Sequence, residues 1–308
     1  MALMLVVHLV RRENGPAALE RFLDSYVAQP PGAEHQLLLA LKGFGSPAEA
    51  APSLVAARSR GLEVERLMLP DDGLDVTAYM RVVATVTATR YCFVNSWSRV
   101  RTAGWLAALE AALDRPGIGL AGATGSWASH REYRRYQVGL ASSYDEVFED
   151  RERTRQGFLA LSRAREPTVR DRGRLAARAG TLGELIRDRG AYARFPSAHL
   201  RTNVFAAPRE LLLELRAPRI RGKSDAYRFE SGVDSITSQA RRLGGGSVVV
   251  AIGATYEPDR WDQSMTFWQG AQQNLIVSDN QTDAYEQAPP GLRRLLSQLA
   301  WGSRAQPE

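Results

Sequence analysis

Short apolar runs alternate with helical patterns along the first 126 residues, and this alternation restricts the fold more than any other feature. Continuous apolar runs are typical of strands that are covered on both faces of a sheet. Between the runs, apolar residues recur at helical spacing, as in "PAALERFLDSYVA" at 16–28. Such alternation favours right-handed βαβ units. The sequence therefore predicts a doubly wound, mainly parallel α/β sheet with strands within 3–10, 35–43, 63–73, 90–96 and 118–126.

The pattern changes in the second half of the chain. Residues 144–194 have a helical, arginine-rich pattern and are expected to form an insertion over one edge of the sheet. The sequence returns to strand at 200–208, continues with a helix at 234–245 that ends in glycine, and adds another strand at 247–253. The tail, 255–308, is dense in aromatic residues and contains an amphipathic helix, "PPGLRRLLSQLAWG". We expect one domain over 1–308.

Composition restricts the class of protein. The hydrophobic fraction of 44% and the charged fraction of 24% are those of a globular protein. The apolar runs are too short to span a bilayer, and the first residues lack the basic region of a signal peptide. The single cysteine, Cys92, cannot form an internal disulfide. These features predict a cytoplasmic protein, at the inner face of a membrane if the insertion contacts lipid.

The insertion carries twelve arginines between 151 and 194, interleaved with acidic residues. One interpretation is a solvated helical face with ion pairs one turn apart. The other is a patch that meets anionic phosphates on a lipid or a polymer, which would give peripheral membrane contact. Nucleic acid is not expected as a partner, because no basic stripe interleaved with aromatics is present.

Polar residues follow the predicted strands at the edge where doubly wound sheets bind their ligands. They form a rim suited to a phosphorylated ligand: Arg11 to Asn14, Lys42-Gly43, Asp71-Asp72-Gly73, Asn95-Ser96 and Thr124-Gly125-Ser126. The Asp-Gly pair, followed by Asp75, is itself a strong turn signal. A tight turn is one interpretation of this stretch, and contact between Asp72 and a nucleotide is the other.

Three stretches occur in an order that carries a resemblance. They are "FVNSWSRVRTAGWLAAL", "HLRTNVFAAPRELLLEL" and "FESGVDSITSQARRLG". Over about residues 3–255 the chain resembles family 2 glycosyltransferases with the GT-A fold. The resemblance implies a nucleotide-binding half at 1–126 and an acceptor and catalytic half at 195–254. The tail stretch "TFWQGAQQNLIVSDNQTDAY" has no counterpart in the family pattern.

In the resembling family an Asp-x-Asp motif after the fourth strand holds a divalent cation against the diphosphate. Here Asn95 and Trp97 stand at the two acidic positions, so the motif is degenerate. We expect no protein-held metal, although the diphosphate could carry a Mg²⁺ or Mn²⁺ with it. Hydroxyls of Ser96 and Ser98, or nearby cations, would offset the leaving-group charge instead. The candidate cations are Arg11, Arg12, Lys42, Arg99, Arg201 and Lys223.

The resemblance also implies a carboxylate that deprotonates the acceptor hydroxyl. Asp234 is the first candidate and Glu230 the second, with Asp225 as a third on the same loop. The alternative for Asp234 is a purely structural cap at the start of the following helix. His199 and Trp268 complete the expected substrate contacts, Trp268 because aromatic rings pack against sugar faces.

Two functional hypotheses follow. The first is an inverting glycosyltransferase that uses a nucleotide-diphosphate sugar and a polysaccharide, or another glycan or lipid-linked acceptor, in building the cell envelope. The second is a catalytically inactive GT-A-fold protein that binds or scaffolds an active transferase. The absent acidic pair leaves both open.

Overall fold

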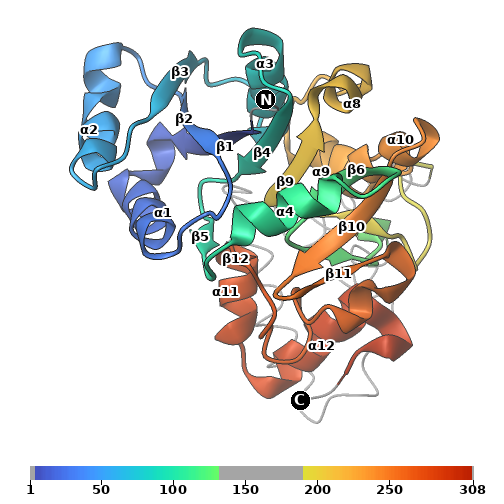
Figure 1. Ribbon diagram of the computed structural model, residues 1–308. Helices are drawn as coiled ribbons and strands as arrows, with labels where there is room; N and C mark the ends of the chain where they lie inside the picture. Colours follow the sequence, from blue (N-terminus) through green and yellow to red (C-terminus); the bar gives the residue numbers. More distant parts are fainter. Residues whose placement is uncertain (1–3, 132–189, 307–308) are drawn as a thin grey trace, which may run out of the picture.

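Eight strands form the central sheet of the protein, whose computed structural model describes residues 4–131 and 190–306 (Figure 1). The order across the sheet is β11-β10-β6-β9-β4-β1-β2-β3. Six strands run in one direction, and β9 and β11 oppose them. The strands are β1 (Met4–Arg11), β2 (His35–Lys42), β3 (Glu65–Leu69), β4 (Arg90–Val94), β6 (Ile118–Gly122), β9 (Val204–Pro208), β10 (Gly246–Ala251) and β11 (Ala254–Tyr256). The predicted mainly parallel α/β architecture is confirmed.

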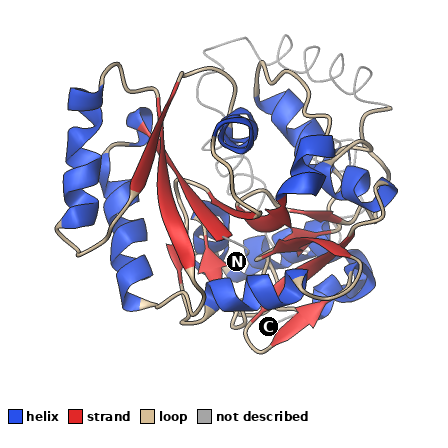
Figure 2. Cartoon of the chain, turned by 45° about the horizontal axis from the view of Figure 1, so that its top comes forward, coloured by secondary structure: helices blue, strands red, loops and turns tan. Residues whose placement is uncertain are grey.

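Helices cover both faces of the sheet, as Figure 2 shows. This is why β1 and β2 have apolar residues on both faces rather than an alternating pattern. One core contains side chains of α1 (Pro16–Ala28), α2 (Pro47–Arg58) and α4 (Trp105–Leu113). The other contains side chains of α3 (Asp75–Thr85), α8 (Arg209–Glu214), α9 (Lys223–Ser231), α10 (Ile236–Arg242) and α12 (Pro290–Trp301).

The C-terminal segment packs on the rest of the chain through buried aromatic and aliphatic residues. It contains η3 (Pro258–Gln263), β12 (Val277–Ser278), α11 (Asn280–Glu286), α12 and η4 (Gly302–Arg304). β12 pairs with β5 (Arg99–Val100), which follows the loop after β4. The rings of Trp261, Phe267 and Trp301 are almost fully buried. The tail therefore anchors beside the carboxyl edge of the sheet, the edge at which the parallel strands end.

A two-stranded ribbon lies beyond β6. It consists of β7 (Gly125–Ser126) and β8 (His199–Leu200), which pair antiparallel. The predicted arginine-rich helical insertion at 144–194 lies outside the described residues, except for 190–194, which form a turn and a loop. Within residues 4–131 and 190–306, every helix is too short or too polar to cross a bilayer.

Candidate functional site

Arg11 and Lys42 are the last residues of β1 and β2, and the strand register sets them side by side. Arg11 follows Leu5, Val7 and Leu9 on the sheet face that α3 covers. The Lys42 side chain is only 1% exposed, and its Nζ donates to the Gly73 carbonyl at 2.7 Å and to Asp71 Oδ1 at 3.3 Å. Two cations therefore stand at the carboxyl edge, as the rim of polar strand ends predicted.

Arg11 is held by a neighbour from its own loop. Its Nη2 lies 2.5 Å from Glu13 Oε1, and the side chain is 21% exposed. The buried Arg11 Nε makes no hydrogen bond to any described residue. A buried polar atom without a partner is uncommon in a folded protein and points to a role other than packing.

Asp75, the first residue of α3, faces these cations. The charges that act on its carboxylate are those of Arg11, Lys42, Glu230 and Glu13. Burial raises the Asp75 pKa, while the positive charges of Arg11 and Lys42 oppose that shift. Sequence reasoning missed this residue as a site candidate. A carboxylate in the first helical turn is common, and the Asp-Gly signal two residues earlier indicates only a turn.

Glu230 reaches the same place from the last turn of α9. Its Oε2 accepts hydrogen bonds from Thr202 Oγ1 at 2.5 Å and from Thr202 N at 3.3 Å. The side chain is half-buried, and its charge acts on both Asp75 and Tyr79 of α3. Strands β1 and β2 and helices α3 and α9 thus converge on one group, which we name the open cluster: Arg11, Lys42, Asp75 and Glu230.

Asp234, the first candidate from the sequence, lies elsewhere. It is exposed and pairs with Arg242. The prediction that it caps the helix is wrong. α10 begins at Ile236, so the N-cap is Ser235, whose Oγ accepts from Ser238 N at 3.3 Å. The cap is the extended residue that immediately precedes the first helical residue, and Asp234 is one position too early.

The stretch before Glu230 is a helix rather than the expected loop. Lys223 is the first residue of α9 and is half-buried. Asp225 lies in the first turn, where its Oδ2 accepts from Arg221 N at 2.9 Å. This contact stabilises the start of the helix, so the Asp225 carboxylate has a structural role.

The stretch at 95–98 forms a closed polar turn. Asn95 Oδ1 accepts from Trp97 N at 3.1 Å and from Ser98 Oγ at 2.8 Å, and Ser96 Oγ donates to the Leu9 carbonyl at 2.7 Å. The amide oxygen is thus occupied within its own loop, and the indole offers no metal ligand. Across the described part of the chain, no group of three or more His, Cys, Asp or Glu is arranged to hold a metal. The residues of this turn do not fit a protein-held cation.

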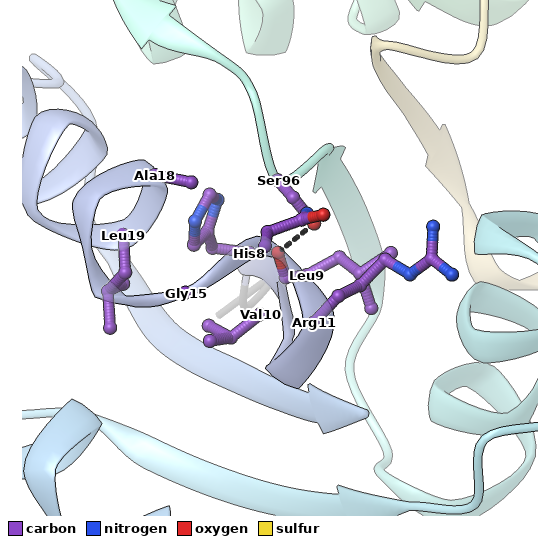
Figure 3. Close-up of a pocket in the computed structure, with 9 residues that line it drawn as sticks. His8, Leu9, Val10, Arg11, Gly15, Ala18, Leu19 and Ser96 are labelled. Carbon is purple, nitrogen blue, oxygen red and sulfur yellow. Dashed lines mark hydrogen bonds between the residues drawn. The ribbon is translucent and has the colours of Figure 1, made fainter. Parts of the chain in front are cut away.

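The turn also borders a narrow pocket around His8 (Figure 3). This pocket has no room even for a water molecule, so it is not a small-molecule site. His8 stacks on Phe22, with ring centroids 3.7 Å apart, and burial lowers its pKa from 6.5 to about 3. His8 points to the α1 side of the sheet and the Arg11 side chain points away from it, although Arg11 also contributes to the lining of this pocket.

His199 lies on β8 near Glu230. Its Nδ1 donates to the Ser197 carbonyl at 2.7 Å, which fixes the neutral tautomer with the lone pair on Nε2. The residue is 5% exposed. Burial lowers the His199 pKa, and the negative charge of Glu230 opposes that shift. The expected substrate contact at His199 stays a prediction.

Three further candidates are engaged in the fold. Arg201 donates to Asp279 Oδ2 at 2.7 Å and lies over the Phe267 ring, so it secures the tail. Asp72 is exposed and forms a two-point ion pair with Arg81. Trp268 is 7% exposed, stacks on the Phe267 ring at 4.5 Å and donates to the Gln281 carbonyl at 3.3 Å. The structure therefore makes Trp268 an anchor of the tail instead of an exposed sugar platform.

No protein-family model matches the chain, and no curated protein matches it. Among solved structures, glucosyl-3-phosphoglycerate synthase from Mycobacterium tuberculosis, in complex with Mn²⁺, uridine diphosphate and phosphoglyceric acid, is 17% identical with a TM-score of 0.39. That match covers 79% of this chain and 66% of the synthase. The mannosyltransferase PcManGT from Pyrobaculum calidifontis, in complex with GDP-Man and Mn²⁺, is 13% identical with a TM-score of 0.43. Here the match covers 80% of this chain and 54% of the other.

The galactosyltransferase LgtC, in complex with donor and acceptor sugar analogs, is 17% identical with a TM-score of 0.30. The match covers 46% of this chain and 53% of LgtC. The chain thus spans between about half and two thirds of these proteins' own lengths. Similarity at this level assigns no role to any residue of this chain.

Proposed function

We propose that the protein is a glycosyltransferase that takes a sugar from a nucleotide-diphosphate sugar and transfers it, with inversion, to a polysaccharide or glycolipid acceptor. The open cluster carries the proposal. Two cations, Arg11 and Lys42, stand beside two carboxylates, Asp75 and Glu230, at the sheet edge where doubly wound folds bind ligands. The three ordered sequence stretches that resemble family 2 glycosyltransferases support the choice of donor.

Arg11 and Lys42 would stabilise the departing diphosphate. Arg11 carries a buried Nε without a partner among the described residues. The Lys42 ammonium has three N–H groups, of which two donate to Gly73 and Asp71. Charge-assisted hydrogen bonds to phosphate oxygens are strong in a partly buried site. A Mg²⁺ or Mn²⁺ that arrives with the diphosphate would be held by the diphosphate's own oxygens and by water.

Glu230 is the proposed general base. Thr202 holds its Oε2 from two donors, and no described residue hydrogen-bonds to Oε1. The acceptor hydroxyl gives its proton to this carboxylate as its oxygen attacks the anomeric carbon from the face opposite the diphosphate. The bond between that carbon and the diphosphate oxygen breaks, and the electron pair leaves with the diphosphate. Asp234 is less suited, because it is exposed and paired with Arg242.

The arginine-rich stretch at 151–194 would bring the enzyme to an acceptor at the membrane surface. Its composition, twelve arginines, supports attraction to anionic headgroups. Binding to anionic liposomes should weaken as salt rises, because charge attraction is screened within about 10 Å at 0.1 M ionic strength. If the protein binds no liposomes of any composition, the arginine-rich stretch is only a solvated face.

Calorimetric titration with UDP-glucose and GDP-mannose, followed by an assay for nucleotide diphosphate release, tests the proposal. We expect one donor to bind and to be turned over. Arg11→Met should weaken binding of the diphosphate, whereas Arg90→Met, which breaks an ion pair with Asp114 at the amino edge, should not. Binding without turnover would favour a scaffolding protein. A donor panel that does not bind at all would contradict the proposal.

A further inference from the structure

Asp75 is held in position by a constrained turn. Gly73 has φ 59°, and a Cβ at this residue would lie 2.2 Å from Thr77 Oγ1, so only glycine fits. The Gly73 carbonyl accepts from Lys42 Nζ at 2.7 Å, which ties the start of α3 to the end of β2. Strand β2 and helix α3 thus place the Asp75 carboxylate at a fixed point of the carboxyl edge.

The Asp75 carboxylate has no partner in the described chain. No described residue donates a hydrogen bond to it, and no described cation lies within ion-pair distance. It is half-buried, and the charges of Arg11, Lys42 and Glu230 all act on it. Every other carboxylate discussed above has at least one donor or cation within reach. A half-buried carboxylate in this condition is a strong sign of a ligand contact.

Tyr79 provides a second, independent observation. Its hydroxyl is buried in a residue that is 1% exposed, and it makes no hydrogen bond to any described residue. Tyr79 lies one helical turn after Asp75, on the same face of α3. Its ring is fixed by Phe93, at a centroid distance of 4.6 Å, and the charges nearest its hydroxyl include Asp75 and Glu230. The Tyr79 hydroxyl is therefore a hydrogen-bond donor without a described partner, one helical turn from the Asp75 carboxylate, which is an acceptor.

We propose that Asp75 binds hydroxyl groups of the transferred sugar and that Tyr79 is the residue that positions it. This inference rests on the proposed function and deepens it, because it names a residue that would recognise the sugar part of the donor rather than its nucleotide part. A carboxylate repels phosphate, so Asp75 suits a neutral polyhydroxyl group. The two carboxylate oxygens would accept from two neighbouring hydroxyls, and the Tyr79 hydroxyl, which has no partner among the described residues, would donate to the same carboxylate in the sugar-bound state.

The location of Asp75 favours a contact with the transferred sugar over one with the ribose of the nucleotide. With the diphosphate on Arg11 and Lys42 and the anomeric carbon near Glu230, the ring hydroxyls would lie close to Asp75, on which the charges of all three residues act. Asp75 would then strengthen the binding of the intact donor without strengthening the binding of the nucleotide diphosphate alone. This difference separates a sugar contact from a structural residue, which would change both affinities together.

The test compares two ligands on each variant by calorimetry: the nucleotide diphosphate and the corresponding nucleotide-diphosphate sugar, in the UDP and the GDP series. In Asp75→Asn, the donor should bind about tenfold more weakly, the effect of one charge-assisted hydrogen bond. Affinity for UDP or GDP alone should stay the same or rise, because the substitution removes a negative charge near the diphosphate. Asp114→Asn is the matched control, because it changes an ion-paired aspartate at the amino edge, and both affinities should be retained.

Tyr79→Phe keeps the ring packing and should reduce the preference for donor over diphosphate by a smaller factor, in the same direction. It also decides the matter if Asp75→Asn does not fold. Equal loss of both ligands, or no loss of either in a folded variant, would overturn the sugar contact. A wild-type protein that binds no donor would instead overturn the proposed function, so the two failures are distinct.

Discussion

Two groups of charged residues at the carboxyl edge differ in how completely they are paired. In the closed pair, Arg201 donates to Asp279 at 2.7 Å, and both side chains are at most 5% exposed. Asp279 also accepts from the backbone N–H groups of Gln281 and Thr282. In the open cluster, Asp75 has no partner among the described residues, and neither do the Arg11 Nε and the nearby Tyr79 hydroxyl.

The difference teaches how to separate a structural charge from a functional one. Burial alone would raise the Asp279 pKa, but Arg201 and the two backbone donors outweigh it and lower that pKa. The Asp75 pKa is raised, because nothing close enough offsets its burial. Arg201 and Asp279 stabilise the tail, whereas the open cluster keeps hydrogen-bonding capacity for a ligand.

The largest expected effect is on the closed pair. Arg201→Met leaves Asp279 buried without its cation and should lower the free energy of unfolding by about 3–5 kcal/mol. Urea denaturation measures it. As control, Arg90→Met breaks a partly exposed pair of the same 2.7 Å length and should lower the free energy of unfolding by about 1 kcal/mol or less. Equal effects of the two substitutions would show that the buried pair is not the stronger anchor.

The next effect concerns acid stability. His8 is fully buried, with a pKa of about 3 against 6.5 for a free side chain. Above pH 6.5 it is neutral in both states and contributes no pH dependence. Below pH 6.5 the unfolded chain gains a proton that the folded chain does not, so stability falls as pH falls.

Between pH 6.5 and pH 4 this contribution should amount to about 3 kcal/mol, at about 1.36 kcal/mol per pH unit. The carboxylates titrate over the same range, so the difference between wild type and His8→Phe isolates the histidine. Phenylalanine keeps the stacking on Phe22 and removes the titration. Parallel pH profiles for the two proteins would show that His8 is not desolvated in the folded state.

A smaller effect on stability is expected in the open cluster. Asp75→Asn removes a charged form that the fold disfavours, so at neutral pH it should leave the free energy of unfolding unchanged or raise it by about 1 kcal/mol. Asp279→Asn should instead destabilise the protein, because it removes the charge that Arg201 needs. Thermal unfolding with matched buffers measures both. Destabilisation by Asp75→Asn would move Asp75 into the structural group.

The smallest expected effect is that of a chelator. Because Arg11 and Lys42 supply the positive charge, donor turnover in excess EDTA should change by less than about twofold. Asn95 Oδ1 is already used by Trp97 N and Ser98 Oγ, which leaves that turn without a free ligand. Complete loss of turnover in EDTA and recovery with Mn²⁺ would require metal ligands elsewhere.

The sequence predicted the fold better than the site. Apolar runs such as 3–10 and helical patterns such as 16–28 depend on local periodicity, and the structure confirms β1 and α1 at those places. The opposed direction of β9 between β4 and β6 was not predicted, because strand direction depends on tertiary pairing. The sequence predicts a loop where α9 lies, because the polar composition of this stretch hides the apolar face at Phe229.

Site residues were harder to rank for a similar reason. Glu230 and Asp234 are four positions apart and look alike in sequence, yet one faces Thr202 and the other Arg242. The break at Gly232, between α9 and α10, directs them to different surroundings. The sequence around Asp75 predicts only a turn. The charges that act on its carboxylate come from residues that are distant in sequence, such as Lys42.

The most direct test of the central claim is donor turnover in Glu230→Gln and Asp234→Asn measured side by side. Glutamine keeps an oxygen for Thr202, so the fold should be retained while the base is lost. Turnover should fall by about 10²–10⁴-fold in Glu230→Gln, the usual contribution of a positioned general base. Asp234→Asn should keep wild-type turnover. The opposite ranking, or unchanged turnover in Glu230→Gln, would show that the base does not lie in the open cluster.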